Sequence, residues 1–272
     1  MTKSLTDQHK TLVMKFGGAS VASPEHFARI ARIIIERKKH YPRIAIVISA
    51  MGNTTDQLIA LAKQVNPDPP RREFDMLVTV GERISIALLA MALSGAGCEA
   101  VSFTGSQSGI ITCSQHSEAR IIEVKPHRIL PVLDLGKVAI IAGFQGVSKA
   151  GEITTLGRGG SDTSAVALGI ALNAEKVEFF KDVPGVFSED PKKNSAASMY
   201  TFLSYQDALD IVLKGAKVLH PRSIELASKN RLPLHVLTFN EAVGSRQEGT
   251  VIGLKEKETT QPAPACCYEE AC

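Results

Sequence analysis

Apolar residues follow two patterns along the chain: short continuous runs, and longer runs with helical spacing. Residues 12–16 and 43–49 are nearly continuous apolar runs, which is typical of parallel strands covered on both faces. Between them, apolar residues recur at helical spacing over 27–34. Ser23-Pro24 comes just before and favours a helix start. The pattern therefore predicts a strand, a helix and a second strand in succession.

The same alternation continues to residue 252, except in the middle of the chain, where short β segments are predicted instead. Helices are predicted over residues 55–65, 73–93, 125–133, 163–172, 204–213 and 220–228. Strands are predicted over residues 98–103, 137–142, 176–180 and 234–239, with short β segments within 109–124, a hairpin arm at 151–155 and an edge strand at 250–252. Strands alternating with helices indicate βαβ units and a mainly parallel sheet.

The composition is that of an ordinary globular protein. Hydrophobic residues make up 44% and charged residues 22% of the 272 residues, and the formal net charge is only +3. A nucleic-acid binder needs a concentrated basic face, so this class is disfavoured. The five cysteines lack CxxC or zinc-ligand spacing, and no metal site is predicted from them. Without an apolar leader or a long apolar run, we expect a cytoplasmic protein that does not contact membranes.

A lysine followed by two glycines ends the first predicted strand. Glycines at the carboxyl end of a parallel strand, here Gly17 and Gly18, let the backbone approach a ligand, and their amides can point at phosphate oxygens. Lys15 adds a positive charge on a long side chain. Taken alone, a tight turn with an exposed lysine is the simpler interpretation.

A second glycine-rich segment, GRGGSDTS at 157–164, leads directly into an apolar helix. A helix N-terminus attracts anions through its unpaired amides. Arg158 suits a carboxylate, and Asp162 either begins the helix or accepts a hydrogen bond that aims Lys15. The chain has no Walker A motif, and Asp162 stands where GxGxxG would need its last glycine. P-loop and Rossmann dinucleotide sites are therefore disfavoured.

Six segments together resemble the catalytic domain of aspartate kinases, within the amino-acid kinase superfamily. They are VMKFGGASVA at 13–22, VISAMGNTTD at 47–56, VGERIS at 80–85, TLGRGGSDTSA at 155–165, KDVPGVFSEDPK at 181–192 and GAKVLHPRS at 215–223. Each is weak alone, but six in the family's order are specific. The resemblance implies a three-layer α/β/α sandwich with a mostly parallel central sheet over residues 12–253. We expect residues 1–11 to be a flexible N-terminus and residues 254–272 a disordered tail.

The resemblance also implies roles for individual residues toward L-aspartate and ATP with Mg²⁺. Lys15 would contact the transferring phosphates and Asp162 would position it. Glu82 would face the α-amino group of aspartate. The other substrate-binding positions would be Ser49, Thr55, Arg158, Gly159, Gly160 and Ser161. The ATP-binding positions would be Lys15, Phe16, Gly17, Gly18, Lys181, Asp182, Phe187, Lys192, Lys217 and Val218. We expect Mg²⁺ to be held mainly by ATP oxygens and water, and we name no protein ligand for it.

Three positions depart from the family's pattern. Ala19 replaces a threonine, Lys181 stands where threonine or serine is usual, and Lys192 replaces an arginine. Lys181 could alter contacts with the nucleotide. From the residues alone, Phe187 could equally belong to the core, and Lys192 and Lys217 could equally be solvated.

The implied activity is transfer of the γ-phosphoryl group of ATP to the β-carboxylate of aspartate, a first step towards lysine, threonine and methionine or diaminopimelate. A carboxylate is already ionised at neutral pH, so no general base is needed. Two alternatives stay open: a kinase for another anion, such as glutamate, acetylglutamate, carbamate or a nucleoside monophosphate, and a non-catalytic partner subunit. The chain stops where regulatory ACT domains would begin, so we expect no intrinsic feedback control, or control through a separate regulatory subunit. A homodimer is expected from family habit alone.

Overall fold

A computed structural model describes residues 10–189, 191, 194, 196–240, 249–255 and 266–270. In this part of the chain a large central sheet has the strand order β10-β12-β11-β9-β1-β2-β6-β3. Every neighbouring pair is parallel except β11 with β12. The strands are β1 (Thr11–Phe16), β2 (Arg43–Ile48), β3 (Ala100–Phe103), β6 (Val138–Ala142), β9 (Lys176–Lys181), β10 (Phe202–Ser204), β11 (Leu234–Thr238) and β12 (Thr250–Gly253).

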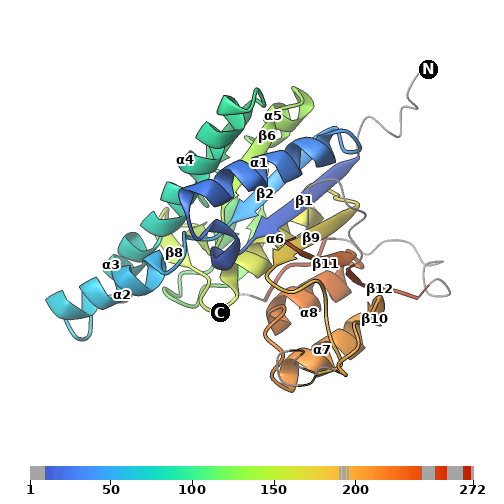
Figure 1. Ribbon diagram of the computed structural model, residues 1–272. Coiled ribbons are helices and arrows are strands. Elements are labelled where there is room, and N and C mark those ends of the chain that lie inside the picture. The colour runs from blue at the N-terminus through green and yellow to red at the C-terminus, as the bar shows by residue number, and fades with distance from the viewer. Residues whose placement is uncertain are drawn as a thin grey trace.

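Helices cover both faces of this sheet (Figure 1), which confirms the predicted three-layer α/β/α fold. One face is covered by α1 (Pro24–Lys38) and α4 (Val80–Gly95). The other face packs against α5 (Leu130–Asp134), α6 (Gly160–Ala171), α7 (Tyr205–Leu213) and α8 (Pro221–Lys229). The helices α2 (Thr54–Val65) and α3 (Arg71–Val78) and the short 3₁₀ helix η2 (Gly18–Val21) complete the set.

A second, four-stranded sheet lies beside α3 and has the order β5-β4-β7-β8. Its strands are β4 (Ile110–Thr112), β5 (Ile121–Val124), β7 (Gln145–Ser148) and β8 (Ile153–Thr155). Three of them fall in segments that the sequence predicted as short β structure, whereas β7 was not foreseen. The strand β8 ends just before the glycine-rich segment at 157–160, so this small sheet places one side of the site.

The alternation of side chains along β1 decides which layer receives the first lysine. Leu12, Met14 and Phe16 point into the core beneath α1 and α4, and Val13 points into the opposite core beneath α6. Successive residues of a strand face opposite sides of the sheet. Lys15 therefore lies on the α6 side, at the carboxyl end of a central strand.

An expected edge strand and an expected single helix are arranged differently in the structure. The segment 250–252 was expected at the sheet edge, but β12 lies second, between β11 and the edge strand β10. That prediction was wrong because β10 has only three residues, too few to give a sequence signal. The predicted helix over 73–93 is divided at Thr79 into α3 and α4. Thr79 keeps nearly helical angles (φ −70°, ψ −10°), so the two helices run almost continuously.

Contrary to the expectation that the chain lacks a long apolar run, Arg71–Gly95 is long and apolar enough, by length and composition alone, to cross a membrane. However, 44% of its most apolar window is buried inside the protein. Val78, Ile86, Leu89 and Leu93 are at most 4% exposed. The run is thus explained as a core helix of the α/β fold.

The C-terminal residues differ from the predicted disordered tail. Residues 266–270 lie against the domain, and Tyr268 packs on the core of the α6 layer. The carboxylate of Glu269 pairs with Arg222 at 2.8 Å and accepts a hydrogen bond from the amide of Ile121 at 2.9 Å. An aromatic ring and one acid facing an arginine anchor this segment, which a compositional argument overlooks.

Candidate active site

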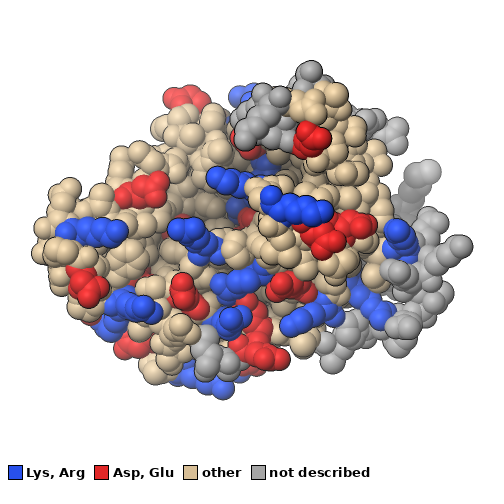
Figure 2. Space-filling view, turned by 90° about the horizontal axis from the view of Figure 1, so that it is seen from below, with Lys and Arg blue, Asp and Glu red and all other residues tan. Residues whose placement is uncertain are grey.

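The carboxyl ends of three adjacent parallel strands, β9, β1 and β2, meet the start of α6 and the start of α4. Such ends, where loops leave a parallel sheet, are the usual place for ligands in open α/β folds. Figure 2 views the molecule from below and shows a hollow in this face with basic and acidic side chains around it. Lys15, Glu82, Asp162 and Lys181 all come from elements that end or begin here.

Lys15 and Asp162 form the ion pair that the sequence predicted. The Nζ of Lys15 lies 2.7 Å from Oδ1 of Asp162, and both side chains are less than 10% exposed. Asp162 stands in the first turn of α6, which begins at Gly160, three residues before the predicted start. The residues Ser161 and Asp162 thus lie in the helix turn whose amides attract anions.

The backbone after Lys15 passes other chain segments closely. A Cβ added at Gly18 would stand 3.3 Å from the carbonyl oxygen of Gly52 and 3.4 Å from that of Ala50. A Cβ at Gly17 would stand 3.4 Å from Nζ of Lys15. A side chain at Gly18 would crowd the loop after β2, whereas one at Gly17 would make only an ordinary contact with the lysine amine. The glycines keep this end of β1 open, as a phosphate-binding loop requires.

Lys181 is a second cation on the same carboxylate. Its Nζ donates to Oδ2 of Asp162 at 3.3 Å. Burial alone would raise the pKa of Asp162, but the charges of Lys15 and Lys181 outweigh it and lower that pKa to about 2. Burial also lowers the pKa of Lys181, against the attraction of Asp162. The sequence analysis predicted Lys181 only as a contact for the nucleotide. Its pairing with Asp162 could not be foreseen, because the two residues belong to different elements, β9 and α6, that meet only in the folded chain.

Glu82 is a buried carboxylate with little compensation from the protein. Its Oε1 accepts a hydrogen bond from the amide of Ala50 at 3.1 Å, while Oε2 has no hydrogen-bond partner among the described residues. Burial raises the pKa of Glu82 to about 7, although that hydrogen bond and the charge of Lys15 oppose the rise. A Cβ at Gly81 would stand 2.7 Å from Cβ of Ala50, so this glycine lets α4 approach the end of β2. A cation arriving from outside would relieve the buried acid.

The loop that carries Arg158 is held in a tight conformation. Gly157 and Gly159 have φ of +71° and +69°, in the left-handed region that favours glycine. A Cβ at Gly159 would stand 2.1 Å from the ring of His220, which caps α8 by accepting from the amide of Arg222. The guanidinium of Arg222 also donates to the carbonyl of Leu156 at 2.6 Å. These contacts fix the loop, and Arg158 itself is exposed.

The remaining predicted residues are placed less closely. Ser49, directly after β2, and Thr55, in the first turn of α2, are half-buried. Ser161 lies beside Gly143, where an added Cβ would stand 2.8 Å from the serine hydroxyl. The ring of Phe16 is fully buried and stacked on Phe180 at 4.6 Å, so only its backbone faces the site. The outer nucleotide positions are the exposed Asp182 and Lys217, the half-buried Phe187 and Val218, and Lys192, which lies outside the described residues.

The sequence model described as the amino acid kinase family matches residues 10–238 of this chain. The chain belongs to the amino acid kinase family. Within this family, it is 48% identical over 249 residues to an aspartokinase of Bacillus sp. (strain MGA3), covering 92% of this chain and 59% of that protein. The chain thus spans about three fifths of the length of that curated relative.

Two solved members of the amino acid kinase family have the same fold. Aspartate kinase from Synechocystis superposes with a TM-score of 0.78 at 40% identity, covering 90% of this chain and 40% of that one. Escherichia coli aspartokinase III, solved in complex with aspartate and ADP, superposes with a TM-score of 0.80 at 27% identity, covering 92% and 66%. The kinase fold and the cationic site at its strand ends therefore occur together in this chain.

Among the described residues, no group of three or more His, Cys, Asp or Glu could hold a metal ion. Both oxygens of Asp162 already face lysines. The described residues therefore do not offer a protein cage for Mg²⁺. The two lysines and the glycine loop do suit the phosphates of a nucleotide.

Proposed function

We propose that this chain is an aspartate kinase, which transfers the γ-phosphoryl group of MgATP to the β-carboxylate of L-aspartate and forms 4-phospho-L-aspartate. One observation carries the proposal: Asp162 holds Lys15 and Lys181 near Glu82, a buried acid that forms no ion pair with any of the described residues. The lysines suit a polyanion and Glu82 suits an ammonium group. The 48% identity to an aspartokinase and the aspartate and ADP bound to the Escherichia coli relative support the same pair of substrates.

The reaction needs charge compensation and no base. An oxygen of the β-carboxylate attacks the γ-phosphorus, and the bond from that phosphorus to the β–γ bridging oxygen breaks to release ADP. No proton moves, because the acceptor is already ionised. Lys15 and Lys181 would offset the charge that gathers on the phosphoryl oxygens and the leaving group. Mg²⁺ would enter with ATP and screen its phosphates.

The substrate's two other charges would be held on opposite sides of the site. Glu82 would accept from the α-ammonium group, and the fork of Arg158 would bind the α-carboxylate. Ser49, Thr55, Ser161 and the amides that begin α6 would contact carboxylate or phosphate oxygens. Phe16, Gly17 and Gly18 through their backbone, with Asp182, Phe187, Lys192, Lys217 and Val218, would surround the nucleotide. This arrangement selects a small amino dicarboxylate by the spacing of its three charges.

The proposal extends to the protein's setting. We expect a cytoplasmic enzyme of lysine and threonine biosynthesis. The expected partner is a second copy of the chain or a regulatory subunit. Because the chain spans only about three fifths of its curated relative's length, both are predictions about the whole protein. None of these depends on the site geometry, and light scattering of the purified chain would test the homodimer.

Trapping the acyl phosphate with hydroxylamine tests the proposed reaction. The purified chain with MgATP should form the hydroxamate of aspartate, and at least a hundredfold less with glutamate or acetylglutamate. A hydroxamate formed mainly from another acid would assign the site to a different anion. Absence of product with every acid, in a folded chain that binds ADP, would favour the non-catalytic subunit.

A further inference from the structure

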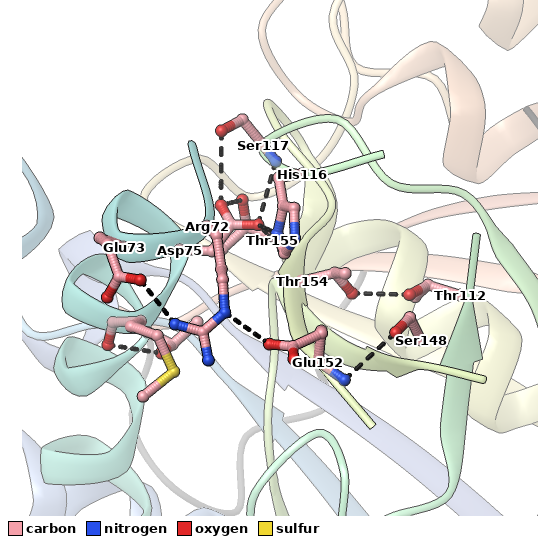
Figure 3. A network of polar contacts seen from close by, with 12 residues as sticks. Arg72, Glu73, Asp75, Thr112, His116, Ser117, Ser148, Glu152, Thr154 and Thr155 are labelled. Carbon is pink, nitrogen blue, oxygen red and sulfur yellow. Dashed lines mark hydrogen bonds and ion pairs between the residues drawn. The ribbon is translucent and has the colours of Figure 1, made fainter. Parts of the chain in front are cut away.

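A fully buried carboxylate outside the site, that of Asp75, joins three segments of the chain (Figure 3). Its Oδ2 lies 2.9 Å from Nδ1 of His116 and accepts from the amides of Ser117 and Thr155, each at 3.1 Å. Its Oδ1 accepts from the hydroxyl of Thr155 at 2.7 Å and from that of Ser117 at 3.4 Å. One side chain on α3 thus holds both the 116–117 turn and the end of β8.

These contacts lead directly to the loop of Arg158. Thr155 is the last residue of β8 and stands three positions before Arg158. The Ser117 carbonyl oxygen would lie 3.1 Å from a Cβ at Gly157, so the turn also touches the loop itself. Ser117 adopts φ of +70°, which is uncommon for a residue with a side chain. Its amide and hydroxyl both face Asp75, which explains why this conformation is held.

The same carboxylate is also tied to Glu82 through the helix. Asp75 and Glu82 are seven residues apart on the nearly continuous run of α3 and α4, which is about two helical turns or 10 Å. Seven residues bring a side chain back to almost the same face, and both acids are buried. Asp75 therefore connects the residue proposed for the ammonium group to the loop proposed for the α-carboxylate.

We infer that Asp75 is a positioning residue that fixes the distance between Glu82 and Arg158, and so sets which amino dicarboxylate the site accepts. The inference rests on the proposed function. A buried carboxylate that accepts several hydrogen bonds is costly to alter and holds its donors rigidly. Arg158 itself is exposed, so the accuracy of its placement depends on how well its loop is anchored.

The chain offers a matched control for this role. Arg72, on the same helix, pairs with Glu152 just before β8 at 2.7 Å, so it joins the same two elements. Both partners are more than 40% exposed. A pair of this kind contributes little to stability. Loss of the Arg72 pair therefore removes a contact between α3 and β8 without disturbing the buried anchor.

The test compares Asp75→Asn, Thr155→Val and Arg72→Ala with the unaltered chain in steady-state kinetics. We expect KM for aspartate to rise about tenfold or more in Asp75→Asn and less in Thr155→Val, while KM for ATP and the Arg72→Ala kinetics stay within about twofold. The preference for aspartate over glutamate, as a ratio of kcat/KM, should fall in the same order. Hydrogen exchange of the amides over 155–160 should be faster in Asp75→Asn than in Arg72→Ala.

Equal losses toward both substrates, or an unchanged aspartate KM in a folded Asp75→Asn protein, would overturn the inference. If Asp75→Asn does not fold, Thr155→Val decides by the same readouts. An unaltered chain that phosphorylates no aspartate would instead refute the proposed function. The exchange rates would still report whether Asp75 anchors the loop, so the two failures can be told apart.

Discussion

Two buried carboxylates, Asp162 and Glu82, lie in one site and differ in almost every electrostatic respect. Asp162 faces two lysines, at 2.7 and 3.3 Å, and its pKa is lowered to about 2. Glu82 accepts a hydrogen bond from the Ala50 amide but forms no ion pair with the described residues, and burial raises its pKa to about 7. The described residues thus provide counter-charges for Asp162, whereas they leave Oε2 of Glu82 without a hydrogen-bond partner.

This contrast separates groups that organise the site from groups that await a ligand. Asp162 pairs with both lysines and orients them, so its own charge is already compensated within the protein. A buried acid without a cation weakens a fold and is a marker of a functional position. The amino group of the substrate would complete Glu82. Under the proposed function, the difference between the two acids would place the amine of the substrate on the α4 side and the phosphates on the α6 side.

The largest effect should come from Lys15→Ala. This change removes the cation closest to Asp162, and we expect kcat to fall about a hundred- to thousandfold because transition-state charge loses its main partner. Circular dichroism should show an intact fold. The control is Lys125→Ala, which changes an exposed lysine directly after β5 and should keep full activity. Near-normal turnover by a folded Lys15→Ala protein would exclude the role given to this amine.

A smaller kinetic effect with a large stability effect is expected for Asp162→Asn. The buried Lys15 and the partly buried Lys181 would remain without their counter-charge, at a cost of about 3–5 kcal/mol. The ionised acid has a pKa of about 2, below its ordinary 3.8, so it stabilises the fold above pH 4 and this contribution is lost as the pH falls through 2. Denaturant unfolding should show a difference in the free energy of unfolding between the two proteins that is constant from pH 5 to 8 and becomes smaller in acid. A variant as stable as the parent at pH 7 would contradict the assignment.

Glu82→Gln should have the smallest effect on kcat and act mainly on aspartate binding. We expect KM for aspartate to rise about ten- to hundredfold and KM for ATP to stay unchanged, since only the ammonium contact is lost. The pKa of Glu82, about 7, exceeds the ordinary 4.5, so its stability contribution is complete below pH 4.5 and is lost as the pH rises through 7. Relative to the parent, the variant should therefore gain stability between pH 5 and 8.5. Equal changes in both KM values would speak against this role.

Local motifs and the alternation of apolar strands with helices were enough to predict the fold class and two ends of the site. The continuous apolar runs located the parallel strands, and the glycine-rich segments located the two ends that meet at Lys15 and Asp162. The partners of Asp75 come from 41 and 80 residues away, so their convergence required the folded chain. The Lys181 contact with Asp162 likewise depends on strand β9 lying next to β1. Composition alone also missed the docking of residues 266–270, because one tyrosine and one glutamate suffice to anchor them.

The most direct test of the role of Glu82 is to measure the protons released when aspartate binds. Isothermal titration at pH 7, in two buffers of different ionisation enthalpy, measures this number. Burial raises the pKa of Glu82 to about 7, so part of this acid is protonated at pH 7, and an ammonium group beside it would drive its ionisation; we therefore predict a net release of protons when aspartate binds. The Glu82→Gln protein should release none. Binding by the unaltered chain without proton release, or equal release by both proteins, would contradict the account.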